Sequence, residues 1–185
     1  MSKNRQDKKL FFRVKKQDHE AFLQAYDLYT DDIYRFIYFK IGNDEEARDI
    51  TSAVFLKVWN YVQSKGLDES KSLRAFIYKV ARNLVIDHYR QNKDRTSSID
   101  DEDIQKSLID EKQNVHADAE KTSDLGLIKE ALPHLKDEYR EVILMHYVDE
   151  LSFTEISEIT GKTQGNIRVL AFRALKALKD LIDNK

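Results

Sequence analysis

The sequence predicts an all-α protein made of two small helical domains joined by a flexible acidic linker. The 185 residues include only five glycines and one proline, which are too few turn-forming residues for a β-sandwich or barrel. Apolar side chains recur at helical spacing on both sides of residues 96–123, a segment with few large apolar residues and no sustained period. Formal charge divides in the same way, with +5 in residues 1–95, −5 in 96–123 and −2 in 124–185.

The N-terminal segment and the residue composition narrow the class of protein. Residues 1–16 form a basic tail outside both domains, and its apolar run Leu10–Phe12 is too short for a secretory signal. No stretch of the chain is apolar enough over the length of a membrane span. Without cysteine, the chain has neither a disulfide framework nor a thiolate zinc site. We therefore expect a cytoplasmic protein that does not insert into a membrane.

The first domain, residues 17–95, shows four helical patterns. The first covers 18–29, and Thr30 is the predicted N-cap of a second helix that ends at Gly42. Asn43 begins a third helix that ends near Gly66. The fourth runs from about Ser70 to Gln91 and has an apolar face. The residues predicted to lie away from that face are Arg74, Tyr78, Arg82, Asn83 and Arg90.

The second domain, residues 124–185, also shows helical patterns with capping residues and apolar faces. One helix extends from Leu135 to Tyr147, and Ser152 opens a short helix that Gly161 ends. Thr163 caps the last helix. A short helix, a glycine turn and a longer helix form a helix-turn-helix pattern. The last helix is predicted to bury Ile167, Leu170, Ala171, Ala174, Leu175 and Leu178 and to expose Gln164, Asn166, Arg168, Arg173 and Lys176.

Each of these features also has a simpler structural interpretation. The helix-turn-helix spacing alone leaves DNA binding open, because exposed arginines and lysines usually form only a solvated helix face. Phe55 and Trp59 lie at the edge of a buried stripe, where an aromatic residue is more often part of the core than of an interface. Tyr78, which has Arg74 and Arg82 beside it, suits stacking on unpaired bases. The five histidines lack metal-ligand spacing, and no nucleophile motif or nucleotide-binding loop is present. The sequence therefore predicts no enzyme, no metal, no cofactor and no small-molecule substrate.

Two ordered stretches resemble bacterial RNA polymerase sigma factors. Residues 22–95, including DLYTDDIYRFIYFKIGNDEEARDITSAVFLKVW and SLRAFIYKVARNLVIDHYRQNK, resemble sigma region two. The stretch LPHLKDEYREVILMHYVDELSFTEISEITGKTQGNIRVLAFRALKALK, from Leu132, resembles region four. The segment between them is too short for a region three. This layout resembles the extracytoplasmic-function (ECF) type, which has regions two and four only.

The resemblance implies a transcription initiation factor that binds core RNA polymerase, recognises the minus-10 and minus-35 elements of promoter DNA and promotes melting. The residues it assigns to core binding are Glu46, Asp49, Ser52, Phe55 and Trp59. Those assigned to minus-10 DNA are Lys65, Arg74, Tyr78, Arg82, Asn83 and Arg90. Those assigned to minus-35 DNA are Thr163, Gln164, Asn166, Arg168, Phe172, Arg173 and Lys176.

The sequence also departs from the family pattern. Ser52 and Ala53 stand where the family usually has Gln-Glu, so one alternative is a sigma-derived helix-turn-helix regulator that does not recruit polymerase. Another is a helical protein-interaction module with no nucleic-acid role. The resemblance leaves open whether an anti-sigma factor holds the protein inactive, which is the family's common arrangement.

Overall fold

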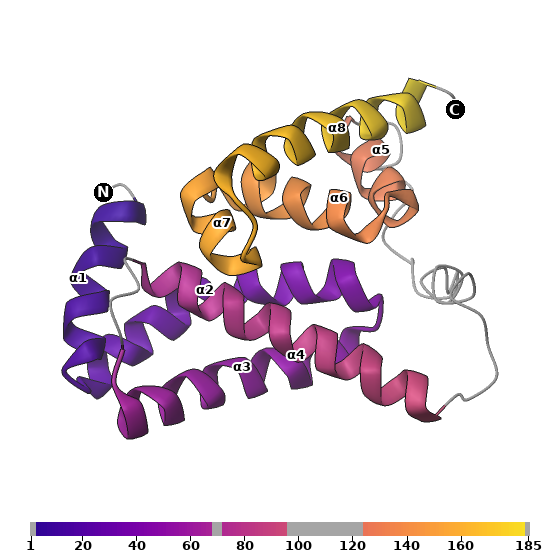
Figure 1. Ribbon diagram of the computed structural model, residues 1–185. Coiled ribbons are helices and arrows are strands. Elements are labelled where there is room, and N and C mark those ends of the chain that lie inside the picture. Colours follow the sequence, from indigo (N-terminus) through magenta and orange to yellow (C-terminus); the bar gives the residue numbers. More distant parts are fainter. Residues whose placement is uncertain (1–2, 68–71, 96–123, 184–185) are drawn as a thin grey trace.

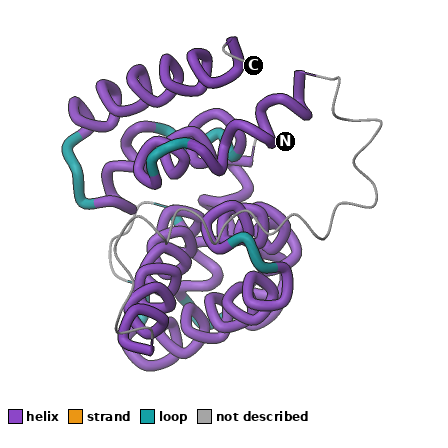
Figure 2. The backbone as a smooth tube through the Cα atoms, turned by 90° about the vertical axis from the view of Figure 1, so that its right-hand side faces the viewer, coloured by secondary structure: helices purple, strands orange, loops and turns teal. Residues whose placement is uncertain are grey.

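The fold is described by a computed structural model over residues 3–67, 72–95 and 124–183. Every regular element in these ranges is a helix, and none of the described residues forms a strand (Figure 2). This confirms the predicted all-α class. The predicted acidic linker, 96–123, lies outside the described residues, as do residues 68–71.

The first domain is built from long helices that share one core. Their bounds are α1 Lys3–Lys15, α2 His19–Ile41, α3 Asp44–Lys65 and α4 Leu73–Arg95. Helix α2 packs against the other three, and its side chains Tyr29, Ile33 and Phe36 are fully buried. Burying an aliphatic or aromatic side chain of this size contributes about 1.5–3 kcal/mol relative to leaving it in water. The apolar face of α2 therefore organises this domain.

Helix α2 is continuous, which corrects the prediction of two helices separated at Thr30. The Thr30 hydroxyl donates a hydrogen bond to the Tyr26 carbonyl at 2.6 Å inside the helix instead of capping a new one. Tyr29 and Ile33, one turn apart, continue the buried face through this point. The predicted end at Gly42 is confirmed, because this residue adopts the left-handed conformation at φ 77°.

Residues 3–15, predicted to be a basic tail without assigned structure, form helix α1. Its apolar side chains Leu10, Phe11 and Val14 are buried against the domain. The buried Asp7 carboxylate accepts hydrogen bonds from the Tyr29 hydroxyl at 2.7 Å and from the Arg74 backbone N–H at 2.9 Å. Helix α1 is therefore an integral part of the first domain.

The second domain surrounds a smaller core. Its bounds are α5 Asp124–Ala131, the 3₁₀ turn η1 Leu132–His134, α6 Asp137–Ile143, the π-helical turn η2 Leu144–Val148, α7 Phe153–Thr160 and α8 Gln164–Asp183. The predicted helix through Tyr147 thus widens into a π-helical turn over its last residues. There His146 contacts the Leu151 carbonyl at 2.8 Å and stacks on the Phe153 ring, with centroids 4.1 Å apart.

The two domains pack directly against each other. Helices α6 and α7 of the second domain lie over α2 and α4 of the first (Figure 1). The Ser72 hydroxyl caps α4 by accepting from the Ala75 N–H at 3.1 Å, and it donates to a Glu155 carboxylate oxygen on α7 at 3.0 Å. The start of α4 is therefore fixed partly by the other domain.

Candidate nucleic-acid and polymerase interfaces

Helix α8 presents the predicted minus-35 residues to solvent. All seven of them are exposed, and Phe172 retains 72% of its accessible surface. The opposite face of the helix is buried through Ile167, Ala171, Ala174 and Leu178. Leu175 is 45% exposed, which corrects its predicted place on the buried face. One face of α8 thus anchors the helix and the other remains free to meet a ligand.

The helix-turn-helix geometry positions the start of α8. Helix α7 begins with a complete capping box between Ser152 and Glu155, as predicted, and ends at Gly161 in the left-handed conformation. The Thr163 hydroxyl then accepts a hydrogen bond from the Asn166 N–H at 3.3 Å, which confirms the predicted cap. Polar side chains near the start of such a helix suit the base edges of a DNA major groove.

Contacts with α7 also orient two of the exposed side chains. The Gln164 side-chain amide donates to the Thr154 hydroxyl at 3.1 Å, and the Arg168 guanidinium lies 5.9 Å from the Phe153 ring centroid. Such contacts reduce the number of conformations that a binding side chain must give up on meeting DNA. The exposed face of α8 is therefore partly preorganised.

The predicted minus-10 residues divide into an exposed and a covered group. Lys65, Asn83 and Arg90 are exposed. The predicted exposure of Arg74 and Tyr78 is wrong, since Arg74 is 6% exposed and Tyr78 is fully buried. The reason is that α4 packs on two sides, against its own domain and against α7, whereas the sequence pattern reveals only the first.

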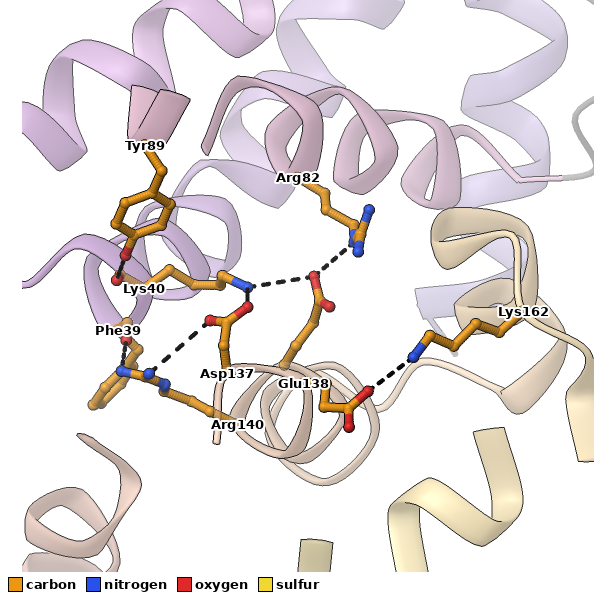
Figure 3. Close-up of polar contacts among 9 residues, drawn as sticks. Phe39, Lys40, Arg82, Tyr89, Asp137, Glu138, Arg140 and Lys162 are labelled. Atoms are coloured by element: carbon orange, nitrogen blue, oxygen red, sulfur yellow. Dashed lines mark hydrogen bonds and ion pairs between the residues drawn. The ribbon is translucent and has the colours of Figure 1, made fainter. Parts of the chain in front are cut away.

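Arg82, the third covered residue, forms an ion pair across the domain boundary. Its Nε atom lies 2.9 Å from the Glu141 carboxylate on α6, and 25% of its side chain is exposed. Lys40 reaches the same carboxylate at 3.6 Å, and its ammonium group lies 2.7 Å from the Asp137 carboxylate (Figure 3). The charges of α2 and α4 are therefore matched to those of α6.

Burial changes the acid–base properties of this boundary. It raises the pKa of Tyr78 well above its ordinary value, and the neighbouring Asp149 carboxylate adds to the effect. Burial also raises the pKa of the Asp149 carboxyl. The ion pair with Arg35 lowers this pKa and so partly offsets the effect of burial. Tyr89, whose hydroxyl donates to the Lys40 carbonyl, has its pKa raised to about 12, mainly by burial and then by Asp137.

The predicted polymerase-binding residues lie on or beside one face of α3. Asp49 and Ser52 are exposed at helical spacing, and Glu46 lies one turn earlier. Phe55 is only 3% exposed and packs on Tyr26, with ring centroids 4.7 Å apart. Trp59 is partly buried against Phe22, with centroids 4.8 Å apart. Both aromatic rings therefore belong mainly to the core, in agreement with the simpler interpretation of their sequence positions.

Other exposed apolar side chains extend this face and were missed by the sequence analysis. They are Leu23 and Tyr26 on α2 and Leu56 on α3, with exposures of 49%, 39% and 63%. Leu56 follows Ser52 by four residues, so the spacing that links Asp49 to Ser52 also places it on this face. The sequence analysis also missed the ion pairs of Arg35 and Lys40, because their partners Asp149, Asp137 and Glu141 belong to the second domain.

The described residues show neither a metal centre nor a membrane span. No group of three or more His, Asp or Glu side chains in the described ranges is arranged to hold a metal ion. Among the same residues, no helix is both long enough and apolar enough to cross a membrane.

Comparison with known proteins decides the family. The family model for sigma-70 region 2 matches residues 25–95, and that for sigma-70 region 4 matches residues 125–178. The ECF RNA polymerase sigma factor SigW of Bacillus subtilis (strain 168) is 32% identical over 179 residues, which cover 93% of this chain and 94% of SigW. This chain belongs to the ECF RNA polymerase sigma factors. It is therefore a transcription initiation factor that directs RNA polymerase, and the alternative of a regulator without polymerase is not favoured.

Two further matches are consistent with this ECF sigma family assignment. The ECF sigma factor BldN of Streptomyces coelicolor (strain ATCC BAA-471 / A3(2) / M145) is 28% identical over 92% of this chain, which spans 63% of BldN. The sigma factor RpoE from Bartonella quintana, solved in complex with the anti-sigma factor NepR, superposes with a TM-score of 0.70. That match covers 88% of this chain and 96% of RpoE at 21% identity, so it supports the fold.

Proposed function

We propose that this ECF sigma factor divides promoter recognition between its two domains. The second domain, residues 124–185, reads the minus-35 element with α8, while the first, residues 17–95, docks on core polymerase and captures and melts the minus-10 element. The observation that carries this division is the face of α8, on which all seven predicted minus-35 residues are exposed. A bidentate arginine–guanine contact supplies about 1–3 kcal/mol of discrimination between bases.

The polymerase-docking surface is the α3 face of Asp49, Ser52 and Leu56, extended by Leu23 and Tyr26. Exposed apolar side chains next to polar ones suit the buried centre and polar rim of a protein interface. Trp59 and Phe55 support this surface from beneath through their ring contacts with α2. Leu56 takes part directly, because 63% of its surface is exposed.

For minus-10 DNA, the exposed group Lys65, Asn83 and Arg90 makes the first contacts. Arg82 can join them only after its ion pair with Glu141 of the second domain breaks, and Arg74 and Tyr78 can join only after they become exposed. Aromatic rings beside cations suit unpaired bases, each of which gains about 1–3 kcal/mol from stacking. The strand-capture surface is thus only partly available in the free chain.

The remaining expectations follow from this role. The protein is not an enzyme, requires no cofactor and works in the cytoplasm, where the DNA lies. The RpoE match was solved bound to an anti-sigma factor, so the proposed partners of this chain include an anti-sigma factor.

Run-off transcription with core RNA polymerase and a pool of genomic DNA fragments tests the proposal. The full chain should produce discrete transcripts that core polymerase alone does not, and sequencing them should reveal a shared two-part promoter. The absence of promoter-specific transcripts would contradict the proposed function. The Leu56→Ala variant should lose core affinity without losing thermal stability, whereas Phe12→Ala, a similarly exposed change on α1, should retain that affinity.

A further inference from the structure

The solvent-facing side of α8 carries a ridge without polar side chains over its first turns. Gly165, Val169 and Phe172 follow one another at spacings of four and three residues, so they lie on one face of the helix. Val169 is 50% exposed and Phe172 is 72% exposed, whereas Ile167 and Ala174 on the opposite face are buried. Figure 1 shows α8 at the edge of the second domain that is remote from the first. We call these three positions the outer ridge.

Gly165 has no reason within the protein to lack a side chain. It lies in the first turn of α8 and does not adopt a left-handed conformation. A methyl group in its place would meet no atom within 4 Å. Glycine is less favourable than alanine in a helix, and it suits positions where another molecule comes close to the backbone. The outer ridge therefore begins where a ligand can approach the helix backbone closely.

The charges beside the outer ridge select the kind of ligand. Arg168, Arg173 and Lys176 are exposed, and among the described residues none of them forms an ion pair with a carboxylate. No acidic residue occurs in α8 before Asp180. A helix face with cations and no anions attracts a polyanion, whose phosphates neutralise the cations. Duplex DNA is therefore the ligand that fits the ridge and its surroundings together.

The apolar part of the outer ridge has one matching group in a DNA major groove. The base edges there present hydrogen-bond donors and acceptors, and the 5-methyl group of thymine is the apolar exception. Apolar side chains such as phenylalanine contact this methyl group in protein–DNA complexes. Val169 and Phe172 have no polar atom with which to bind any other feature of a base edge. Their chemistry therefore points to thymine.

We propose that the outer ridge of α8 reads thymines in the minus-35 element. Val169 and Phe172 contact the thymine 5-methyl groups, and Gly165 lets the helix approach the bases closely enough for these contacts. This inference rests on the proposed function of α8, and it adds Gly165 and Val169 to the residues that recognise DNA. It also assigns a base to Phe172, because an apolar ring favours thymine over cytosine, which lacks the methyl group.

The test uses the holoenzyme assembled from the full chain and core RNA polymerase. A duplex DNA library with a randomised window is selected for binding, and core polymerase alone is taken through the same selection as a reference. Duplexes of the enriched sequence are then made with deoxyuridine in place of each thymine in turn. Deoxyuridine pairs with adenine as thymine does and lacks only the 5-methyl group, so the change in affinity reports the methyl contact.

The variants separate the outer ridge from other exposed apolar groups. The ridge variant is Val169→Ala with Phe172→Ala. Its control is Tyr147→Ala with Val148→Ala, which shortens two comparably exposed apolar side chains of the same domain outside α8. Circular dichroism and core association are measured for both variants, and both should match wild type because the altered side chains are exposed.

Wild type and the control should bind roughly fourfold more weakly when deoxyuridine replaces a contacted thymine, a factor that corresponds to about 0.8 kcal/mol for one buried carbon group. The ridge variant should bind the unmodified duplex more weakly and should not distinguish deoxyuridine from thymine at those positions. Gly165→Ala should also weaken binding without lowering the melting temperature, because the added methyl group has free space in the unbound protein.

Several results would overturn the proposal. They are wild-type binding that is insensitive to deoxyuridine at every thymine of the enriched sequence, a ridge variant that keeps the wild-type sensitivity, and a ridge variant that loses core association, which would place the ridge against polymerase. Unchanged DNA binding by Gly165→Ala would overturn the role of that residue. Failure of the proposed function looks different, because no sequence would then be enriched over core polymerase alone, and this inference would fall with it.

Discussion

The two candidate DNA surfaces of this ECF sigma factor differ in how they are presented. On α8 and its cap Thr163, all seven predicted minus-35 residues are exposed. Of the predicted minus-10 residues on α4, Asn83 and Arg90 are exposed, Arg74 and Tyr78 are buried, and Arg82 pairs with Glu141 of the second domain. The candidate minus-35 surface is thus available in this structure, whereas much of the candidate minus-10 surface is covered. Packing as well as residue type therefore decides which candidate surface is open to a ligand.

The largest expected effect compares two aromatic residues from these surfaces. Tyr78→Ala removes a fully buried ring and should lower the free energy of unfolding by about 3–5 kcal/mol. Phe172→Ala removes a 72% exposed ring and should change it by about 0.5 kcal/mol or less. Urea unfolding of both variants measures the difference. Tyr78→Phe, which removes only the hydroxyl, is the control and should remain close to wild type; equal losses in the two alanine variants would contradict the comparison.

A smaller effect concerns recognition by α8. Arg168→Ala and Arg173→Ala should each cost about 1–3 kcal/mol in minus-35-dependent transcription, with core association unchanged, because both side chains are exposed. Transcription from templates with intact and scrambled minus-35 elements measures this cost. Lys179→Ala, further along the same exposed helix, is the control and should leave the ratio unchanged. A parallel loss of core binding would show that the arginines have a structural role.

Alkaline pH should destabilise the folded protein through Tyr89. The pKa of Tyr89 is raised to about 12 in the folded protein, so the folded state keeps a proton that the unfolded chain loses near pH 10. The free energy of unfolding should therefore fall as pH rises from about 10 to 12, by up to about 1.4 kcal/mol per pH unit for this residue. Denaturation at a series of pH values measures the slope. Tyr89→Phe should reduce it but not abolish it, because the pKa values of Tyr34 and Tyr78 are raised as well, and an unchanged slope would contradict the assignment.

The smallest expected effect is at the start of α8. Thr163→Ala removes the side-chain acceptor for the Asn166 N–H and should cost about 1 kcal/mol of stability. Thermal unfolding monitored by circular dichroism measures this loss. Thr163→Ser retains the hydroxyl and should recover most of the stability. If the serine variant is as unstable as the alanine variant, the cap is not the source.

Features that lie within a single helix are predicted well from the sequence. The capping box at Ser152, the left-handed glycines 42 and 161 and the exposed face of α8 all depend on residues within one or two turns of each other. Thr30 shows the limit of such local signals, because a threonine can cap a helix or bond back inside one, and the buried run through Tyr29 and Ile33 selects the second outcome.

Features that depend on packing between distant segments were not predictable in the same way. The burial of Tyr78 and Arg74 depends on the packing of α4 between its own domain and α7, which is far away along the chain. The helical structure of residues 3–15 could have been inferred from the spacing of Leu10, Phe11 and Val14. The many charged residues of this segment obscured that signal. The pairing of Lys40 with Asp137 follows no local pattern at all.

The most direct test of the division of promoter recognition locks the two domains together, so that the covered minus-10 residues stay covered. Ser72→Cys with Glu155→Cys places two thiols at a hydrogen-bonded contact in a chain without other cysteines, where a short, reductively cleavable cross-linker can join them. Run-off transcription with core polymerase then compares the linked and cleaved forms. We expect the linked protein to support no promoter-specific transcription and cleavage of the linker to restore it. Full activity of the linked protein would contradict it.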